Sequence, residues 1–194
     1  MPTVSMGLLG FILFFIYDLN DAFWKKKILN GLFAVGVFLI GISVVIEIVC
    51  SIETIPKFGL TSFLGLTFAL LFFVGLMYTL FFALPFKGTY IEVSEIRKTY
   101  KFGVYALCRH PGLGCFIGLF FFLYIAWPTP SVGIMSALYS GLNLLYVIFQ
   151  DWLTFPVIFS DYDHYKAETP FVIPNLRSIH ACFRTLNMEE GNLP

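Results

Sequence analysis

The chain has 194 residues, of which 58% are hydrophobic and 12% charged, and its formal net charge is zero. A soluble domain carries about 25% charged residues, so these side chains are too few to cover a water-facing surface, and we expect a lipid bilayer around the protein. The balanced charge provides no basic field, so nucleic acid is not an expected partner.

The N-terminal segment is apolar over residues 4–17 and is followed by a short acidic stretch and the lysine run 25–27. A secretory signal peptide starts with a basic region and ends at a small-residue cleavage site, and this segment has neither. We therefore expect a retained transmembrane helix. Asp18 and Asp21 are expected to pair locally with the lysines.

Five apolar segments approach the roughly 20 residues that a helix needs to cross the hydrocarbon core. They cover residues 4–23, 28–50, 59–86, 112–127 and 131–155. The "PTP" sequence at 128–130 predicts a tight turn, so the last two segments should form a helical hairpin. The fold class predicted is therefore all-α, a polytopic membrane protein with about five transmembrane helices. It divides into helices 1–3 (1–86), a region with helices 4 and 5 (87–175) and a C-terminal segment (176–194) that forms a surface helix or is loosely ordered.

The basic residues sort to one side of this predicted arrangement. All of the twelve lysines and arginines except Lys57 lie after the first, third or fifth segment. Loops rich in lysine and arginine stay in the cytosol. The N-terminus is therefore expected outside, with the loop 87–111 and the C-terminus in the cytosol, in a bacterial plasma membrane or an ER-type membrane. Glu47 would then be an interfacial carboxylate near the outer end.

The spacing of the four cysteines and of two glycines predicts structural roles for these residues. The four cysteines lack the tight pairwise spacing of a structural zinc site, so we read them as small apolar residues and expect no metal and no disulfide framework. Gly114 and Gly118 form a G-x-x-x-G pattern in the fourth segment, which predicts close contact with another helix.

A polar stripe follows the fifth segment at helical spacing, which places its members on one face of the helix. Its residues are Asn143, Tyr146, Gln150 and Thr154. Polar groups inside a membrane are costly and are often functional. Two interpretations stay open: the stripe forms hydrogen bonds to neighbouring helices, or it lines a cavity that opens to the cytosol.

His110 stands directly before Pro111, which disfavours helical geometry at the histidine and suits the first turn of the next helix. The imidazole is then held at a helix N-terminus, where partial positive charge favours the neutral ring and attracts anionic groups. A capping histidine and a ligand-binding histidine both fit this position. His164 and His180 lie in polar stretches and are expected at the surface.

The C-terminal half resembles the isoprenylcysteine carboxyl methyltransferase and phospholipid N-methyltransferase group of integral membrane enzymes. The sequences of these enzymes contain, in order, G-x-Y, R-H-P, a helical hairpin, an acidic pair, a phenylalanine and two tyrosines. They end this region with a sequence similar to T-P-x-x-I-P. The matching residues lie within 87–175 and are "GVY" at 103–105, "RHP" at 109–111, Phe159, Tyr162, Tyr165 and "TPFVIP" at 169–174.

The resemblance implies a methyltransferase that uses S-adenosyl-L-methionine on the cytosolic side, with a lipophilic or small carboxylate, amine or thiol acceptor. The cofactor residues carried over are Tyr105, His110, Pro111, Leu113, Gln150, Asp151, Tyr162 and Tyr165, with backbone from 97–100. Asn143, Tyr146 and Arg109 are assigned to the substrate, Arg109 through lipid phosphate or the end of the hairpin. No side chain is assigned as catalytic, because direct methyl transfer needs none.

Two positions depart from the family pattern. Leu113 replaces a usual tyrosine, and Gln150-Asp151 replaces a usual Glu-Glu pair. Fold and activity are separable, so two alternatives stay open. The first is a non-catalytic membrane protein that retains the methyltransferase fold. The second is an NADPH enzyme similar to the membrane sterol reductases, although the chain has no G-x-G-x-x-G sequence.

Overall fold

The computed structural model describes residues 2–52, 59–83 and 97–186, and the elements named in these ranges are all helices. The expected all-α architecture is therefore confirmed for the described residues. The predicted end of the third span at 84–86, the basic residues Lys57 and Lys87, and the last residues of the tail at 187–194 lie outside them.

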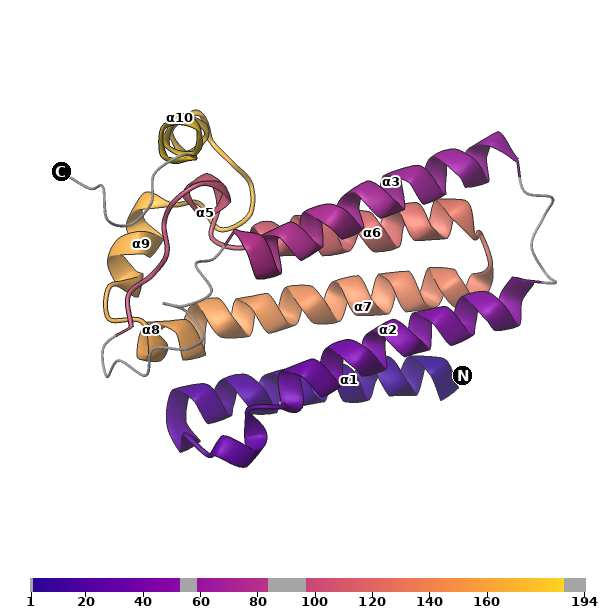
Figure 1. Ribbon diagram of the computed structural model, residues 1–194, viewed down its shortest axis with the longest axis horizontal. Helices are drawn as coiled ribbons and strands as arrows, with labels where there is room; N and C mark the ends of the chain where they lie inside the picture. The colour runs from indigo at the N-terminus through magenta and orange to yellow at the C-terminus, as the bar shows by residue number, and fades with distance from the viewer. Residues whose placement is uncertain (1, 53–58, 84–96, 187–194) are drawn as a thin grey trace.

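Five long helices make up the body of the protein (Figure 1). They are α1 (Pro2–Leu19), α2 (Leu32–Ser51), α3 (Leu60–Met77), α6 (Pro111–Ala126) and α7 (Pro130–Phe149). Single π-helical turns extend α1 as η1 (Asn20–Trp24), α3 as η4 (Tyr78–Phe82) and α7 as η5 (Gln150–Thr154). A 3-10 turn, η2 (Lys27–Leu29), leads into α2. The short helices are α5 (Val104–Leu107), α8 (Phe155–Ile158), α9 (Tyr162–Glu168) and α10 (Leu176–Thr185).

Four of the helical stretches are long and apolar enough to cross a membrane, namely Pro2–Trp24, Lys27–Ser51, Leu60–Phe82 and Pro130–Ile158. The fifth predicted span, α6, has only 16 residues and falls short of that length. Pro111 starts it, and the "PTP" turn ends it. This turn joins α6 to α7 as a hairpin, as expected.

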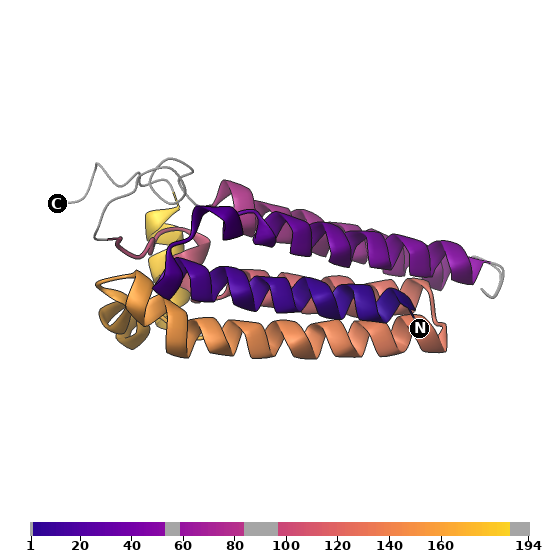
Figure 2. The ribbon, with the colours of Figure 1, turned by 90° about the horizontal axis from the view of Figure 1, so that it is seen from below.

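The long helices pack as two pairs with α7 between them (Figures 1 and 2). α1 lies along α2, α3 lies along α6, and α7 contacts both α1 and α6. Aromatic rings fill the centre: Phe11 of α1 packs edge-on against Phe14, Phe116 and Tyr139. Large apolar side chains also remain exposed along the outside of α2 and α3, among them Phe38, Leu70 and Leu71, which suits contact with lipid.

Glycines allow two helix pairs to approach backbone to backbone. A Cβ on Gly36 would lie 2.7 Å from the carbonyl oxygen of Gly10, and a Cβ on Gly65 would lie 2.7 Å from the backbone nitrogen of Ala126. Gly118 is also a contact position, because the ring of Phe72 covers it, as the G-x-x-x-G pattern predicted. The prediction was wrong for Gly114, which faces open space.

Buried polar contacts connect α1 to its neighbours. Asp18 is 4% exposed and accepts a hydrogen bond of 2.8 Å from Nε2 of Gln150, so its predicted pairing with lysines was wrong. The reason is position: Asp18 lies on the face of α1 that meets α7. Asp21 does pair with Lys25, and also with Arg97 at 2.7 Å. Glu47 is buried and accepts a hydrogen bond from Thr3, which joins α1 to α2.

The contact between α1 and α2 gives a test. Gly36→Ala should reduce the free energy of unfolding by about 1–3 kcal/mol, because the new methyl group meets the backbone of Gly10 and the ring of Phe14. Gly41→Ala is the matched control on the same helix, since a Cβ there meets nothing within 4 Å. Thermal unfolding in detergent micelles measures both. Equal stability of the two variants would contradict this packing.

Candidate functional site

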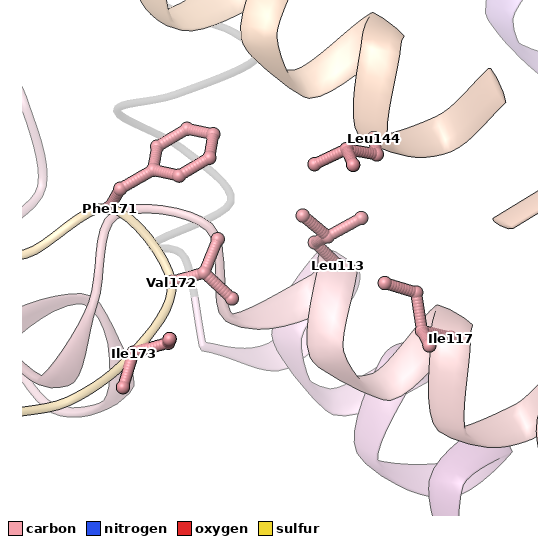
Figure 3. Close-up of a pocket in the computed structure, with 6 residues that line it drawn as sticks. All are labelled: Leu113, Ile117, Leu144, Phe171, Val172 and Ile173. Atoms are coloured by element: carbon pink, nitrogen blue, oxygen red, sulfur yellow. The ribbon is translucent and has the colours of Figure 1, made fainter. Parts of the chain in front are cut away.

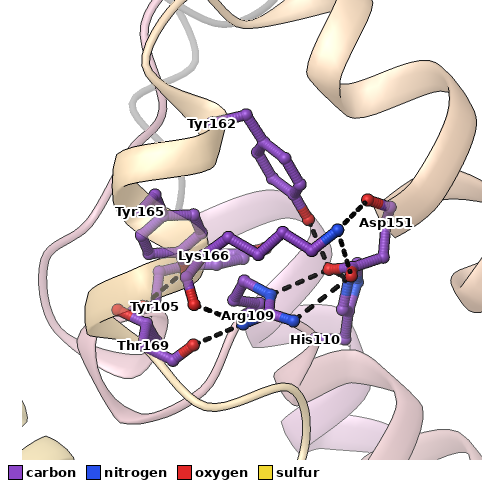
Figure 4. Close-up of polar contacts among 8 residues, drawn as sticks. All are labelled: Tyr105, Arg109, His110, Asp151, Tyr162, Tyr165, Lys166 and Thr169. Carbon is purple, nitrogen blue, oxygen red and sulfur yellow. Dashed lines mark hydrogen bonds and ion pairs between the residues drawn. The ribbon is translucent and has the colours of Figure 1, made fainter.

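The carboxylate of Asp151 is the centre of a polar cluster at the end of the bundle where α7 finishes and α6 begins (Figure 4). Asp151 is 1% exposed and lies in the π-helical turn η5. Pro156 follows in α8 and lacks the N–H that would bond to the carbonyl of Trp152. The series of α-helical backbone hydrogen bonds is therefore interrupted at this point. The wider turn thus aims the carboxylate into the protein.

Four side chains contact this carboxylate. Arg109 binds it through both oxygens, Nε to Oδ1 at 2.8 Å and Nη2 to Oδ2 at 3.2 Å. Tyr162 donates to Oδ1 at 2.6 Å, and Nε2 of His110 lies 3.1 Å from the same oxygen. The ammonium of Lys166 lies 3.4 Å from Oδ2 and donates to the Asp151 carbonyl. The charge of Asp151 is therefore fully compensated by the protein itself.

Arg109 also holds the end of α9 and the segment that follows it. Its Nη1 donates to the carbonyl oxygens of Lys166 at 3.1 Å and Thr169 at 2.5 Å, and its guanidinium lies 5.6 Å from the ring centre of Phe171. The side chain is 9% exposed. Arg109 was predicted at the substrate, through lipid phosphate or the end of the hairpin. The structure places its guanidinium inside the protein, bonded to Asp151 at the end of the hairpin.

His110 precedes α6, and Pro111 occupies the first turn, both as predicted. The imidazole lies nearly parallel to the ring of Phe155 and meets the ring of Phe171 edge-on. Burial lowers the pKa of His110 and outweighs the opposing effect of the Asp151 carboxylate. The ring is thus neutral at pH 7, and its Nε2–H tautomer can donate to Asp151.

Three tyrosines of the predicted set belong to the same end. Tyr165 donates to the carbonyl of Tyr105 at 2.6 Å, and the Tyr105 hydroxyl donates to the carbonyl of Thr79 at the end of α3. Burial raises the pKa of Tyr162 and of Tyr165, so both stay protonated donors at neutral pH. Tyr162 therefore belongs to the Asp151 cluster, whereas Tyr105 and Tyr165 form a separate link to α3.

Two of the four residues in the polar stripe of the fifth span contact α1. Tyr146 packs against Phe14 and Phe15, and Gln150 binds Asp18. Thr154 is fully buried, and its hydroxyl has no hydrogen-bond partner among the described residues. Asn143 is half-buried on α7. For Tyr146 and Gln150 the contacts match the interpretation as helix packing.

An apolar groove of about 400 Å³ lies next to the cluster, between α6, α7 and the segment after α9 (Figure 3). It is lined by Leu113, Ile117, Leu144, Phe171, Val172 and Ile173. Phe171 belongs to both places, because it lines the groove and also contacts Arg109 and His110. Leu113, predicted at the cofactor, is one of the lining residues.

Several residues of this site could not be predicted from the sequence. Lys166 and Thr169 lie in the segment that carries the resemblance, but nothing in a linear pattern shows that one reaches Asp151 and the other Arg109. Phe171 and Ile173 are part of the "TPFVIP" sequence and were noted only as motif letters. The 97–100 stretch is held by Asp161, which accepts a hydrogen bond from the Thr99 N–H at 2.7 Å.

Comparison with known proteins does not assign a family: no family model, no curated protein and no solved structure matches the chain.

The Asp151 cluster predicts a large stability effect. Asp151→Asn should cost about 3–5 kcal/mol of unfolding free energy, because it leaves the buried guanidinium of Arg109 without a counter-charge. Tyr162→Phe removes one hydrogen bond to a charged group and should cost about 1.5–3 kcal/mol. Glu168→Gln is the control, since it alters only the exposed pair with His164. Thermal unfolding in micelles would contradict the arrangement if Asp151→Asn matched this control.

His110 predicts a pH dependence. The unfolded chain takes up a proton at this residue below about pH 6.5, while the folded protein resists it because its pKa is lowered. The contribution of His110 to stability should therefore be complete well above pH 6.5 and fall on acidification, by at most about 1.4 kcal/mol per pH unit. His110→Gln should reduce the slope between pH 7.5 and 5.5, and His164→Gln should keep it. Unchanged slopes in both variants would contradict the burial of a neutral imidazole.

Proposed function

We propose that this chain is an integral membrane methyltransferase that uses S-adenosyl-L-methionine on a lipophilic acceptor. The observation that carries the proposal is the convergence of the motif residues Arg109, His110 and Tyr162 on one buried carboxylate, beside an apolar groove that shares Phe171 with them. Arg109 and His110 lie 42 and 41 residues before Asp151 in the sequence, and Tyr162 lies 11 residues after it. Arg109, His110 and Tyr162 carry the resemblance to the membrane methyltransferases.

The distribution of charge supports a cytosolic position for this site. The lysines and arginines of the described residues lie in the η1–η2 loop, the 97–109 segment, α9 and α10, and these segments gather at one end of the bundle (Figure 1). Positively charged loops stay on the cytosolic side of a membrane. In this proposal the cluster and the C-terminal helices face the cytosol, and α1 begins on the opposite side.

The aromatic and helix-terminal groups fit the proposed cofactor. S-adenosylmethionine would supply an activated methyl group, and it carries a carboxylate, an ammonium and an adenine ring. The N-terminus of α6 at Pro111 suits a carboxylate. The half-buried ring of Tyr105 would provide aromatic surface for adenine or for the cationic sulfonium.

Asp151 fits the ammonium in a different way from the one the resemblance implies, because its oxygens already have partners. Lys166 is the most exposed of these partners, at 32%, and it makes the longest contact, 3.4 Å. A ligand ammonium carries the same charge as Lys166 and would replace it at Oδ2 without leaving the carboxylate unpaired. Asp151 would continue to orient Arg109 and His110 while the ligand is bound.

The apolar groove suits the lipophilic part of an acceptor. Three of its lining residues, Leu113, Ile117 and Leu144, come from the apolar helices α6 and α7, so an acceptor would reach it from within the bilayer. The chain's own contribution to the reaction is to hold the acceptor beside the polar cluster and to exclude water. A carboxylate or thiolate acceptor needs no catalytic base at neutral pH.

A second candidate, a non-catalytic membrane protein with the same fold, is favoured by one observation. The Asp151 cluster is complete without any ligand, since Arg109, His110, Tyr162 and Lys166 compensate the carboxylate. Such a cluster would also serve to fasten the C-terminal segment onto the hairpin. The two candidates differ in whether the cluster binds S-adenosylhomocysteine.

Calorimetric titration of the purified chain with S-adenosylhomocysteine tests the proposal. Binding is expected, and His110→Ala should weaken it by about tenfold or more, the effect of losing roughly 1.4 kcal/mol of contact. Leu144→Trp fills the groove away from the polar cluster, so it should leave this binding unchanged and lower methyl transfer to lipophilic acceptors. His164→Ala, which changes an exposed residue of α9, controls for nonspecific effects.

Other outcomes of this titration decide against the proposal. A folded chain that binds no S-adenosylhomocysteine would support the non-catalytic candidate. Binding of NADPH in its place would support a reductase.

A further inference from the structure

The C-terminal helix α10 has two different sides. Ser178 and Cys182 are buried against the protein, and α10 packs on α5. On the outside, Leu176 is 84% exposed and Phe183 is 72% exposed. Two large apolar side chains on the side of α10 that faces away from the protein core are costly to expose to water. They indicate a further contact surface.

The helix is held firmly in place, so its outer side has a defined direction. A capping box closes its first turn, with the Asn175 side chain accepting from the Ser178 N–H and the Ser178 hydroxyl accepting from the Asn175 N–H. At its other end, the Thr185 hydroxyl accepts a hydrogen bond of 3.0 Å from the Gly103 N–H. Residues 176–185 are therefore a surface helix, the first of the two forms expected for this segment.

The outer side of α10 combines apolar and cationic groups. Arg177 and Arg184 are seven residues apart, so they share one face, and both are exposed. They lie to one side of Leu176 and Phe183 on the helix surface, and α10 contains no acidic side chain. Positive charge beside exposed apolar side chains complements an anionic lipid surface.

The chain leads from the apolar groove directly into α10. Ile173, which is 84% exposed, lines the apolar groove together with Ile117 and Leu144 of the membrane helices. Leu176 follows three residues later. α10 also lies across the direction of the long helices, near their end (Figures 1 and 2). With those helices crossing a bilayer, α10 lies along its surface.

We propose that α10 is an interfacial helix that binds the anionic phospholipid surface of the leaflet next to the Asp151 cluster. Leu176 and Phe183 enter the boundary between headgroups and acyl chains, and Arg177 and Arg184 bind lipid phosphates. This inference is independent of the methyltransferase proposal, because it uses none of the residues assigned to the cofactor.

The test uses the full chain in lipid nanodiscs with a fluorescent NBD probe on a single cysteine. Phe183→Cys carries the probe, and His164→Cys on α9 is the matched control at an exposed position of the same end. Both are made in a variant whose four natural cysteines are alanine. Doxyl-labelled phosphatidylcholine should quench the probe at 183 at least about threefold more than at 164, because quenching requires entry into the acyl boundary. Equal quenching at both positions would overturn the proposal.

A second experiment, on the chain with its natural cysteines, tests whether α10 requires anionic lipid. Arg177→Gln with Arg184→Gln should reduce the phosphatidylglycerol that remains bound to the purified chain by about fivefold per arginine, and leave bound phosphatidylcholine unchanged. These arginines are exposed, so the variant keeps its packed core. Unchanged phosphatidylglycerol would overturn the proposal, as would self-association of the chain through Leu176 and Phe183 seen by light scattering.

Discussion

A guanidinium and a carboxylate meet in the interior of this protein, where neither charge reaches water. Arg109 and Asp151 are 9% and 2% exposed at their side chains and form two parallel hydrogen bonds. Removing two charges from water costs several kcal/mol per ion, and only good geometry with further hydrogen bonds compensates for it. His110, Tyr162 and the carbonyl of Thr169 provide those bonds. The local structure of 97–171 is therefore built around one pair.

This pair connects three separate parts of the chain. Arg109 precedes α6, Asp151 lies in the turn η5 that follows α7, and the carbonyls of Lys166 in α9 and Thr169 just after it accept hydrogen bonds from the guanidinium. Beside it, Gln150 binds Asp18 and so brings α1 to the same end of the bundle. The helices are positioned by apolar packing along their length, while their ends on this side are fixed by polar contacts.

Hydropathy predicted the long helices, because about twenty apolar residues leave few alternatives, and the "PTP" turn predicted the α6–α7 hairpin. The meeting of His110 with Asp151 was expected only through the resemblance and the hairpin together. What could not be predicted is which partner each buried polar group selects. Asp18 sits near three lysines in the sequence yet binds Gln150, because helix rotation decides which face is buried. Likewise the pattern of Gly114 and Gly118 does not reveal which glycine meets a neighbour.

The shortness of α6 has a consequence for the surrounding lipid. Its 16 residues rise about 24 Å, against a hydrocarbon thickness of about 30 Å. Such a hydrophobic mismatch is accommodated by local thinning of the bilayer or by tilt. Thinning around α6 would draw headgroups inward beside His110. A lipid with its reactive group at the headgroup level would then meet the polar cluster without leaving its leaflet.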